Sequence, residues 1–213
     1  MIKTDKIITN FVDDYPSDNY PSFIDRNPIN LEKGLQSFTF YLPSDPNSVY
    51  KVISVMDSWE DEPIIQYLSL CMEFKNSYFP KIYSVNYYKV NGKVGGDFII
   101  VHMERLFDYF NFESFYRSEL IRIGLDYYKL NFEDLDASSE QFSEYMRIEF
   151  GKIEELINVI KDEELKFALV LLKDLFKEFG PDLEFKNIMV RDDHGDKHLV
   201  LTDPISPHPV HYT

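Results

Sequence analysis

Apolar positions along the first hundred residues predict a sheet with one helix. Aromatic and β-branched residues are concentrated in four short stretches, each bounded by turn-forming residues. The strands expected from them are 37–41, 49–55, 82–90 and 97–103. Apolar residues at helical spacing predict one helix over 60–75. We therefore expect a mostly antiparallel sheet that carries a single helix.

The first 30 residues have a different pattern. They are rich in Asp, Asn and Pro, which favour turns over regular strands. We expect a loop-rich extension with little regular structure over residues 1–30.

The second half of the chain has a mainly helical pattern. Residues 107–179 carry few strand signals, and from 165 to 179 apolar residues recur every three or four positions. Gly180 and Pro181 then predict the end of that helix. Beyond it, two short apolar stretches around a turn predict a β-hairpin, with the order 188–191, 192–196 and 199–202.

Together these patterns predict an α+β fold in two parts. A β-rich lobe with one helix is expected over residues 1–103, and a helical lobe with a terminal β-hairpin over 104–213. A chain of 213 residues is long enough for one domain or two small lobes with a real core.

The chain carries a large excess of negative charge. Its 37 acidic residues against 22 Lys and Arg give a formal net charge of −15, and residues 131–164 are especially acidic. Such a surface disfavours free nucleic acid as a ligand, because phosphate binding needs Lys and Arg. Residues 131–164 are either a solvated helical surface or an acidic face. Such a face would dock a basic partner or mimic nucleic acid to block one.

The sequence predicts no membrane partner. No apolar run approaches the roughly 18 residues needed to cross a bilayer, and the N-terminus lacks the apolar core of a signal peptide. Cys71 is the single cysteine, so an internal disulfide is excluded. We expect a soluble protein of the cytoplasm.

Three polar residues near the end of the chain have a spacing suited to phosphoryl transfer. Asn187 follows Asp182 after five residues, and Asp203 stands at the far end of the predicted hairpin. Because a hairpin returns the chain, the three are expected to converge. Phosphoryl transfer needs a carboxylate that orients a hydroxyl and accepts its proton, and oxygen ligands for Mg²⁺. Asp182 alone is explained as a turn cap and Asp203 alone as a strand end, but their joint spacing favours catalysis.

The same residues resemble protein kinase motifs. Asp182-Leu183 and Asn187 match the D-L-x-x-x-N of the kinase catalytic loop, and Asp203 matches the Asp of D-F-G. The resemblance implies a two-lobed kinase fold in which Asp182 is the catalytic base. It also implies that Asn187 and Asp203 hold the metal.

Further matches concern the nucleotide. Val49-Tyr-Lys51-Val resembles V-A-I-K, which implies that Lys51 pairs with the phosphates of ATP. Residues 99–106 resemble the strand that runs into the kinase hinge, whose backbone binds adenine. The nucleotide-binding residues implied in this way are Gly34 and Ser37 of the phosphate loop, Val49, Lys51, and Met103, Glu104 and Leu106 of the hinge. The helix after Lys51 should also offer it a glutamate. Gln66 stands at the expected distance, and among Glu60, Glu62 and Glu73 at other positions we prefer Glu62 as the ion-pair partner.

A closer resemblance is to the early serine/threonine kinase of T-seven-type bacteriophages. The shared spacing, a glycine followed by P-x-x-P-N-x-V-x-K-V, stands here from Gly34 to Val52. N-I-M after the catalytic loop, and T-D-P in place of D-F-G, stand at 187–189 and 202–204. The family implies ATP with Mg²⁺ as cofactors and host proteins as substrates, in the host cytoplasm.

The chain departs from the common kinase pattern in several places. Gly180-Pro181 replace the usual His-Arg, so an activation-loop phosphate would find no arginine to bind. Glu184 stands where many kinases have a lysine, and Lys186 is expected to contact the γ-phosphate instead. Ten residues follow Asp203, so we expect a minimal fold that lacks most of the usual C-terminal lobe. Any substrate platform must then come from residues 107–150 or from another chain.

Other functions stay open at this point. A degenerate kinase would inhibit a host enzyme by binding through the acidic face 131–164. A small-molecule phosphotransferase is less favoured, because no dedicated substrate-binding insert is visible. Ser206 is either a phosphoacceptor or a turn residue. A C-terminal group of histidines has enough members for a metal site, although it spans a predicted strand: His194, His198, His208 and His211.

Overall fold

A computed structural model describes most of the chain and divides it into two compact units. The described residues are 10–16, 29–33, 37–55, 63–91, 97–123, 153–155, 157–158, 160–183 and 187–205. The first unit comprises Met1–Glu73 and Lys81–Arg105, and the second comprises Phe74–Pro80 and Leu106–Thr213. The first unit thus continues two residues beyond the predicted division after residue 103, and residues 74–80 belong with the second unit.

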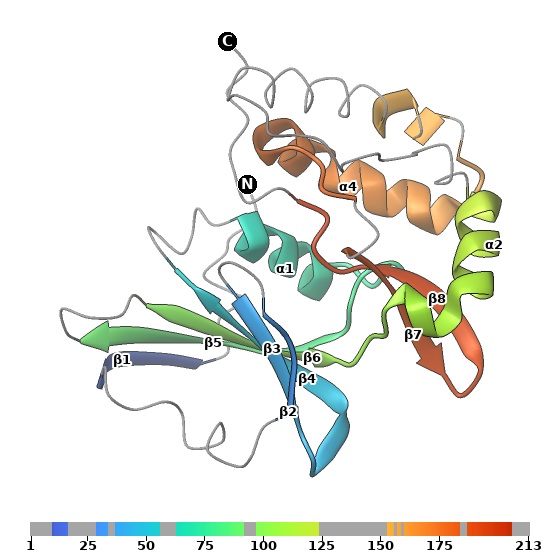
Figure 1. Ribbon diagram of the computed structural model, residues 1–213. Helices are drawn as coiled ribbons and strands as arrows, with labels where there is room; N and C mark the ends of the chain where they lie inside the picture. Colours follow the sequence, from blue (N-terminus) through green and yellow to red (C-terminus); the bar gives the residue numbers. More distant parts are fainter. Residues whose placement is uncertain are drawn as a thin grey trace, which may run out of the picture. The chain divides into compact units, whose positions relative to one another are not determined.

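The first unit is built on a six-stranded sheet with the order β1-β5-β6-β4-β3-β2 (Figure 1). Its strands are β1 (Asn10–Pro16), β2 (Ile29–Lys33), β3 (Ser37–Leu42), β4 (Asp45–Ser54), β5 (Ile82–Asn91) and β6 (Phe98–Glu104). All neighbouring strands are antiparallel except β1 and β5, which are parallel. The mixed α+β class and the mostly antiparallel sheet agree with the sequence-based expectation.

The expectation of little regular structure over residues 1–30 was wrong for the part that the structure describes, because residues 10–16 form β1 and residues 29–30 begin β2. Both strands form edges of the sheet. An edge strand needs hydrogen-bonding partners on one side only, so it tolerates the Asp, Asn and Pro residues that disfavour central strands. Pro16 ends β1, where a missing N–H costs least. Pairing with β5 thus overrides the local turn propensity.

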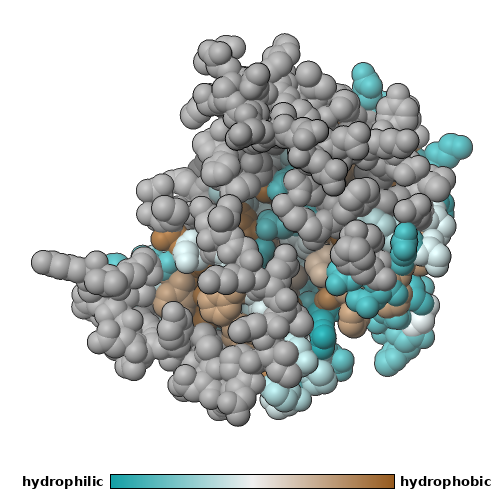
Figure 2. All heavy atoms as spheres, in the orientation of Figure 1, coloured by the Kyte–Doolittle hydropathy of each residue, from teal (hydrophilic) through white to brown (hydrophobic). Residues whose placement is uncertain are grey.

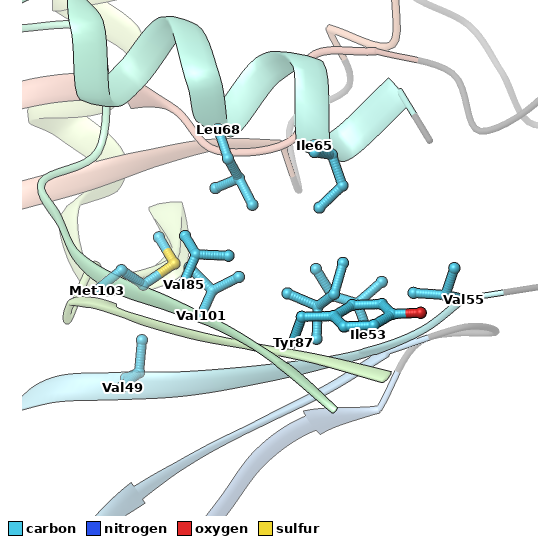
Figure 3. Packing of buried hydrophobic residues seen from close by; sticks show 10 residues of the cluster. Val49, Ile53, Val55, Ile65, Leu68, Val85, Tyr87, Val101 and Met103 are labelled. Carbon is cyan, nitrogen blue, oxygen red and sulfur yellow. The ribbon is translucent and has the colours of Figure 1, made fainter. Parts of the chain in front are cut away.

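One face of the sheet packs against helix α1 (Pro63–Glu73). Ile65 and Leu68 point from α1 towards Val85, Val101 and other apolar residues of the strands (Figure 3). Ile65 and Val101 are completely buried. Burial of each such side chain stabilises the fold by roughly 1.5–3 kcal/mol. This cluster fixes the inner faces of β4, β5 and β6.

In the residues that the structure describes, the second unit contains two helices of more than ten residues and a hairpin. Its elements are the 3-10 helix η3 (Tyr109–Phe112), α2 (Glu113–Ile123), α4 (Glu163–Phe179), β7 (Ile188–Asp193) and β8 (Asp196–Leu201). Figure 2 shows hydrophilic side chains gathered over the region of α2 and the β7–β8 hairpin. Within the described part of the chain, no helix has both the length and the apolar character needed to cross a membrane.

Helix α4 ends where the sequence predicts, and a side-chain cap marks its beginning. The Asp162 side chain caps the first turn by accepting a 3.0 Å hydrogen bond from the Leu165 N–H. Gly180 follows the last residue with a φ of 83°, a conformation that favours glycine, and its N–H donates to the Phe176 carbonyl. The predicted apolar face is buried from Leu165 to Phe179. Asp182 therefore follows shortly after a helix that is held in place by its buried apolar face.

The predicted β-hairpin is confirmed, with Ile188 opposite Leu201 and Asp193 opposite Asp196. The turn between the strands is made by His194 and Gly195, which have φ values of 57° and 99°. Positive φ at both central positions gives the tight turn that matches strand twist. The hairpin returns the chain after Asn187 to a point beside Asp182.

Candidate active site

The structure brings the backbones of Asp182, Asn187 and Asp203 together within the second unit. Asp182 follows α4, Asn187 directly precedes β7, and Asp203 lies two residues after β8. The Asp182 N–H donates a 2.7 Å hydrogen bond to the carbonyl of Pro204. An isolated β-bridge also pairs Pro181 with Ile205. The segment that carries Asp203 therefore runs antiparallel to the segment that carries Asp182.

Asn187 joins the same two segments through its side chain and its main chain. Its side-chain amide nitrogen donates a 2.9 Å hydrogen bond to the Asp182 carbonyl. Its own carbonyl accepts a 2.8 Å bond from the Thr202 N–H. Only 8% of Asn187 is exposed, so these bonds satisfy polar groups that water reaches poorly. Asn187 is thus a central connection of the site.

The donor set at this site fits Mg²⁺. Because the amide nitrogen of Asn187 bonds to Asp182, the amide oxygen is the atom that Asn187 can offer to a cation. Asp203 is half-buried and carries a carboxylate. Mg²⁺ prefers oxygen ligands and commonly takes one or two carboxylates, with phosphate oxygens completing the coordination. Among the described residues, no cluster of three or more His, Cys, Asp and Glu side chains offers a metal site made by protein alone.

The histidine alternative gains no support from the described residues. His198 Nε2 lies 3.2 Å from the Asp196 carboxylate, and His194 Nε2 lies 4.0 Å from the Asp193 carboxylate. Each histidine thus lies near a carboxylate of its own hairpin. His208 and His211 lie outside the described residues.

Lys51 lies in the first unit, on the face of the sheet that α1 covers. Side chains alternate along a strand, so Lys51 shares a face with Val49 and Ile53, which both belong to the cluster beneath α1. Directly opposite on β6 is Val101, which is completely buried. Lys51 is half-buried among these apolar neighbours. The opposite face of the sheet also carries a buried apolar cluster, which includes Phe40, Val52 and Ile100, so the feature specific to Lys51 is its place on the side that α1 covers.

The other nucleotide-binding candidates of the first unit are spread over three strands. Ser37 begins β3 and is half-buried, and Val49 is buried beneath α1. Met103 is paired with Val49 across β4 and β6. Glu104 ends β6 and is buried, and its carboxylate accepts a 2.8 Å bond from the Lys81 N–H. The chain then passes from the first unit to the second between Arg105 and Leu106, within the segment expected to be a hinge.

Three predicted site residues lie outside the described residues, namely Gly34, Glu62 and Lys186. Ser206 and most of the acidic segment 131–164 lie outside them as well.

A Ser-His-Asp grouping in the first unit resembles a nucleophilic site but has the wrong order. The Ser48 hydroxyl donates a 2.5 Å bond to the Asp45 carboxylate, and His102 Nε2 lies 2.8 Å from the same hydroxyl oxygen. Serine therefore stands between the acid and the histidine, whereas an activated serine needs histidine in the middle. Ser48 is only 3% exposed, so no substrate reaches it. The grouping instead fastens the start of β4 to β6.

Sequence reasoning missed Arg191, a buried arginine on β7. Its guanidinium donates hydrogen bonds to the carbonyls of Ser77 and Phe79, more than a hundred residues earlier in the chain. The available signal was a cation directly after the apolar run Ile188-Met-Val190. Nothing in the local pattern indicated its partners.

No protein-family model matches the chain, and no curated protein matches its sequence significantly. The resemblance to kinases therefore rests on the sequence motifs.

Proposed function

We propose that the protein is a small ATP-dependent serine/threonine kinase with a minimal two-lobed kinase fold. One observation carries the proposal: main-chain and side-chain hydrogen bonds join the segments of Asp182, Asn187 and Asp203 within one unit. These are the three residues that a phosphoryl-transfer site needs closest together. The inward-facing position of Lys51 and the order of the motifs along the chain also support it.

Each residue has a distinct role in the proposed reaction. Asp182 orients the acceptor hydroxyl and accepts its proton. Asn187 and Asp203 would hold Mg²⁺, which neutralises charge on the β- and γ-phosphates when bound. Lys51 donates a charge-assisted hydrogen bond to the phosphates. The bond between the γ-phosphorus and the β,γ-bridging oxygen breaks as the hydroxyl oxygen bonds to that phosphorus, and ADP leaves.

The proposed acceptor is a Ser or Thr hydroxyl on a host protein, with the host cytoplasm as the site of action. Support for this acceptor comes from the T-D-P and N-I-M motifs shared with the phage kinases.

Labelling of a bacterial lysate with γ-labelled ATP and Mg²⁺ tests the proposed function. The wild-type protein should label itself or lysate proteins. Asp182→Asn and Asp203→Asn should each lower labelling at least a hundredfold while circular dichroism remains unchanged. Asp174→Asn, at an exposed position of α4, is the matched control and should label normally. Equal labelling by all four proteins would overturn the mechanism.

A second candidate function is inhibition of a host protein by binding. It is favoured by exposed carboxylates at Glu155 and Glu163, together with the formal net charge of −15. In that case the kinase-like fold would serve as a scaffold for an acidic surface that docks on a basic partner.

A further inference from the structure

The segment 74–80 connects α1 to β5 but is held by the second unit. Asn76 donates a 2.8 Å side-chain bond to the carbonyl of Glu164 at the start of α4. The Tyr78 hydroxyl donates a 2.9 Å bond to the Asp162 carboxylate. These two bonds fasten the segment to the N-terminal end of α4. Its opposite side faces the hairpin.

Three consecutive carbonyls of the segment bond to the hairpin. Those of Ser77 and Phe79 accept bonds of 2.8 Å and 2.9 Å from the two terminal nitrogens of Arg191. The carbonyl between them, that of Tyr78, accepts a 2.8 Å bond from the N–H of Leu201 at the end of β8. Arg191 of β7 thus holds the Ser77 and Phe79 carbonyls, which flank the Tyr78 carbonyl that bonds to β8.

Burial makes this use of Arg191 consequential. Its exposed fraction is 8%, so its charged group is largely removed from water. A buried guanidinium is tolerated only when hydrogen bonds replace its hydration. Its planar fork can reach two separate carbonyls at once in a fixed geometry, which the single ammonium of lysine reproduces poorly. Loss of Arg191 would therefore release the Ser77 and Phe79 carbonyls and change the geometry of the segment 74–80.

The same contacts continue to Asp203. Leu201 bonds to Tyr78, Thr202 bonds to the carbonyl of Asn187, and the Pro204 carbonyl accepts the N–H of Asp182. Asp203 lies between these anchored neighbours. Its position therefore depends on the catalytic segments on one side and on the segment 74–80 on the other.

We infer that Arg191 is a positioning residue for the metal-binding Asp203. It holds the Ser77 and Phe79 carbonyls so that the Tyr78 carbonyl meets the Leu201 N–H, which fixes the approach of the chain to Asp203. The metal-binding role of Asp203 rests on the proposed function. The anchoring of Leu201 does not, and it is measurable separately.

Amide hydrogen exchange tests the anchoring directly. In Arg191→Met, exchange at the Leu201 amide should accelerate about tenfold or more, because its acceptor is no longer held. Amides of β4 in the first unit should be unchanged. Arg191→Lys should keep part of the protection. Tyr78→Phe retains its carbonyl and loses the bond to Asp162, whereas the bonds of Asn76 and Arg191 still hold the segment, so the Leu201 amide should stay protected. Unchanged Leu201 exchange in a folded Arg191→Met or Arg191→Lys protein would overturn the inference.

Metal binding and kinetics test the consequence for Asp203. In Arg191→Met and Arg191→Lys, the Mg²⁺ concentration for half-maximal phosphate transfer should rise several-fold, with a smaller increase in Arg191→Lys. Broadening of the Asp203 amide signal by Mn²⁺ should weaken in the same order. ATP affinity without metal should not change. Normal Mn²⁺ broadening at Asp203 in Arg191→Met would overturn the positioning role. If the Arg191 variants change exchange and broadening as expected but the wild-type protein transfers no phosphate, the proposed function alone would be overturned.

Discussion

The side-chain amide of Asn187 donates a 2.9 Å hydrogen bond to the main-chain carbonyl of Asp182. This bond directs the Asn187 amide oxygen away from Asp182 and makes it the atom that can face a cation. It also makes the geometry of the candidate base depend on a candidate metal ligand. A change at Asn187 should therefore affect both roles together.

Asn187→Leu keeps nearly the same side-chain volume and removes this bond and the oxygen ligand. We expect phosphate transfer to fall at least a hundredfold and the free energy of unfolding to fall by about 1–3 kcal/mol. Labelling assays and denaturant unfolding measure the two effects. Asn111→Leu removes an amide that bonds to Asp108 at an exposed position and should change neither by much. Wild-type transfer by Asn187→Leu would exclude Asn187 from the site.

Lys51→Met should weaken ATP binding about ten- to a hundredfold, because a charge-assisted bond contributes roughly 1.5–3 kcal/mol. The substitution keeps the side-chain length and suits the apolar surroundings of Lys51, so the fold should be preserved. Lys89→Met, on an exposed position of β5, provides the comparison and should bind ATP normally. Calorimetric titration of both variants would decide the question. Equal affinities would demote Lys51 to a structural residue.

Acid should weaken a network around Asp162. Partial burial alone would raise the pKa of Asp162, but bonds from the Leu165 N–H, the Tyr78 hydroxyl and Arg122 outweigh it and hold this pKa below its usual value. An unfolded Asp has a pKa of about 3.9. The stabilisation is therefore complete above about pH 4 and is lost as the pH falls through the lower, folded pKa.

Asp162→Asn tests this sign, because asparagine caps a helix as well as aspartate does. The variant should be less stable at pH 7 by under about 1 kcal/mol, since the Arg122 side chain is 54% exposed. Denaturant unfolding between pH 7 and pH 3 should show the difference shrinking towards the acid end. Asp174→Asn serves as the control. A difference that stays constant with pH would show that charge plays no part.

Charge reversal separates catalysis from binding. Glu154 forms a 2.6 Å ion pair with Lys173, and the Glu164 carboxylate bonds to Ser77, so reversal there would also disturb the fold. Glu155 and Glu163 are exposed and test the surface charge more cleanly. The measurement is growth of a bacterial host that expresses the protein, with a growth defect as the readout. If phosphorylation is the function, Asp182→Ala should abolish the defect, and Glu155→Lys/Glu163→Lys should retain it. The reverse pattern would favour the binding function, with partner affinity falling steeply as salt is added.

The predictable part of the fold depended on local patterns. Stretches of aromatic and β-branched residues located β3 to β6, of which β4 and β6 are buried on both faces, and helical spacing of apolar residues located α1 and α4. The terminal hairpin followed from a turn between apolar stretches. Strands β1 and β2 were missed because their formation depends on pairing at sheet edges rather than on their own composition.

The candidate site was likewise predictable in one part and not in another. The grouping of Asp182, Asn187 and Asp203 was predictable because a hairpin of known length separates the last two. Arg191 was not predictable, because its acceptors are carbonyls of residues 112 and 114 positions away. Main-chain carbonyls carry no sequence signal, so a side chain that binds them shows its importance only in three dimensions.

The position of residues 74–80 in the second unit also affects how the protein is made. A ribosome completes α1, this segment and the sheet strands long before it reaches Arg191 and Leu201. Until then, the carbonyls of Ser77, Tyr78 and Phe79 must be hydrated, since their partners do not yet exist. The first unit can therefore assemble during translation. The second unit is completed only when residues 74–80 bind to the hairpin, after β8 has been synthesised. Cutting the chain between Arg105 and Leu106 would give a C-terminal fragment without that piece, so the fragment should refold only when residues 74–80 are supplied with it.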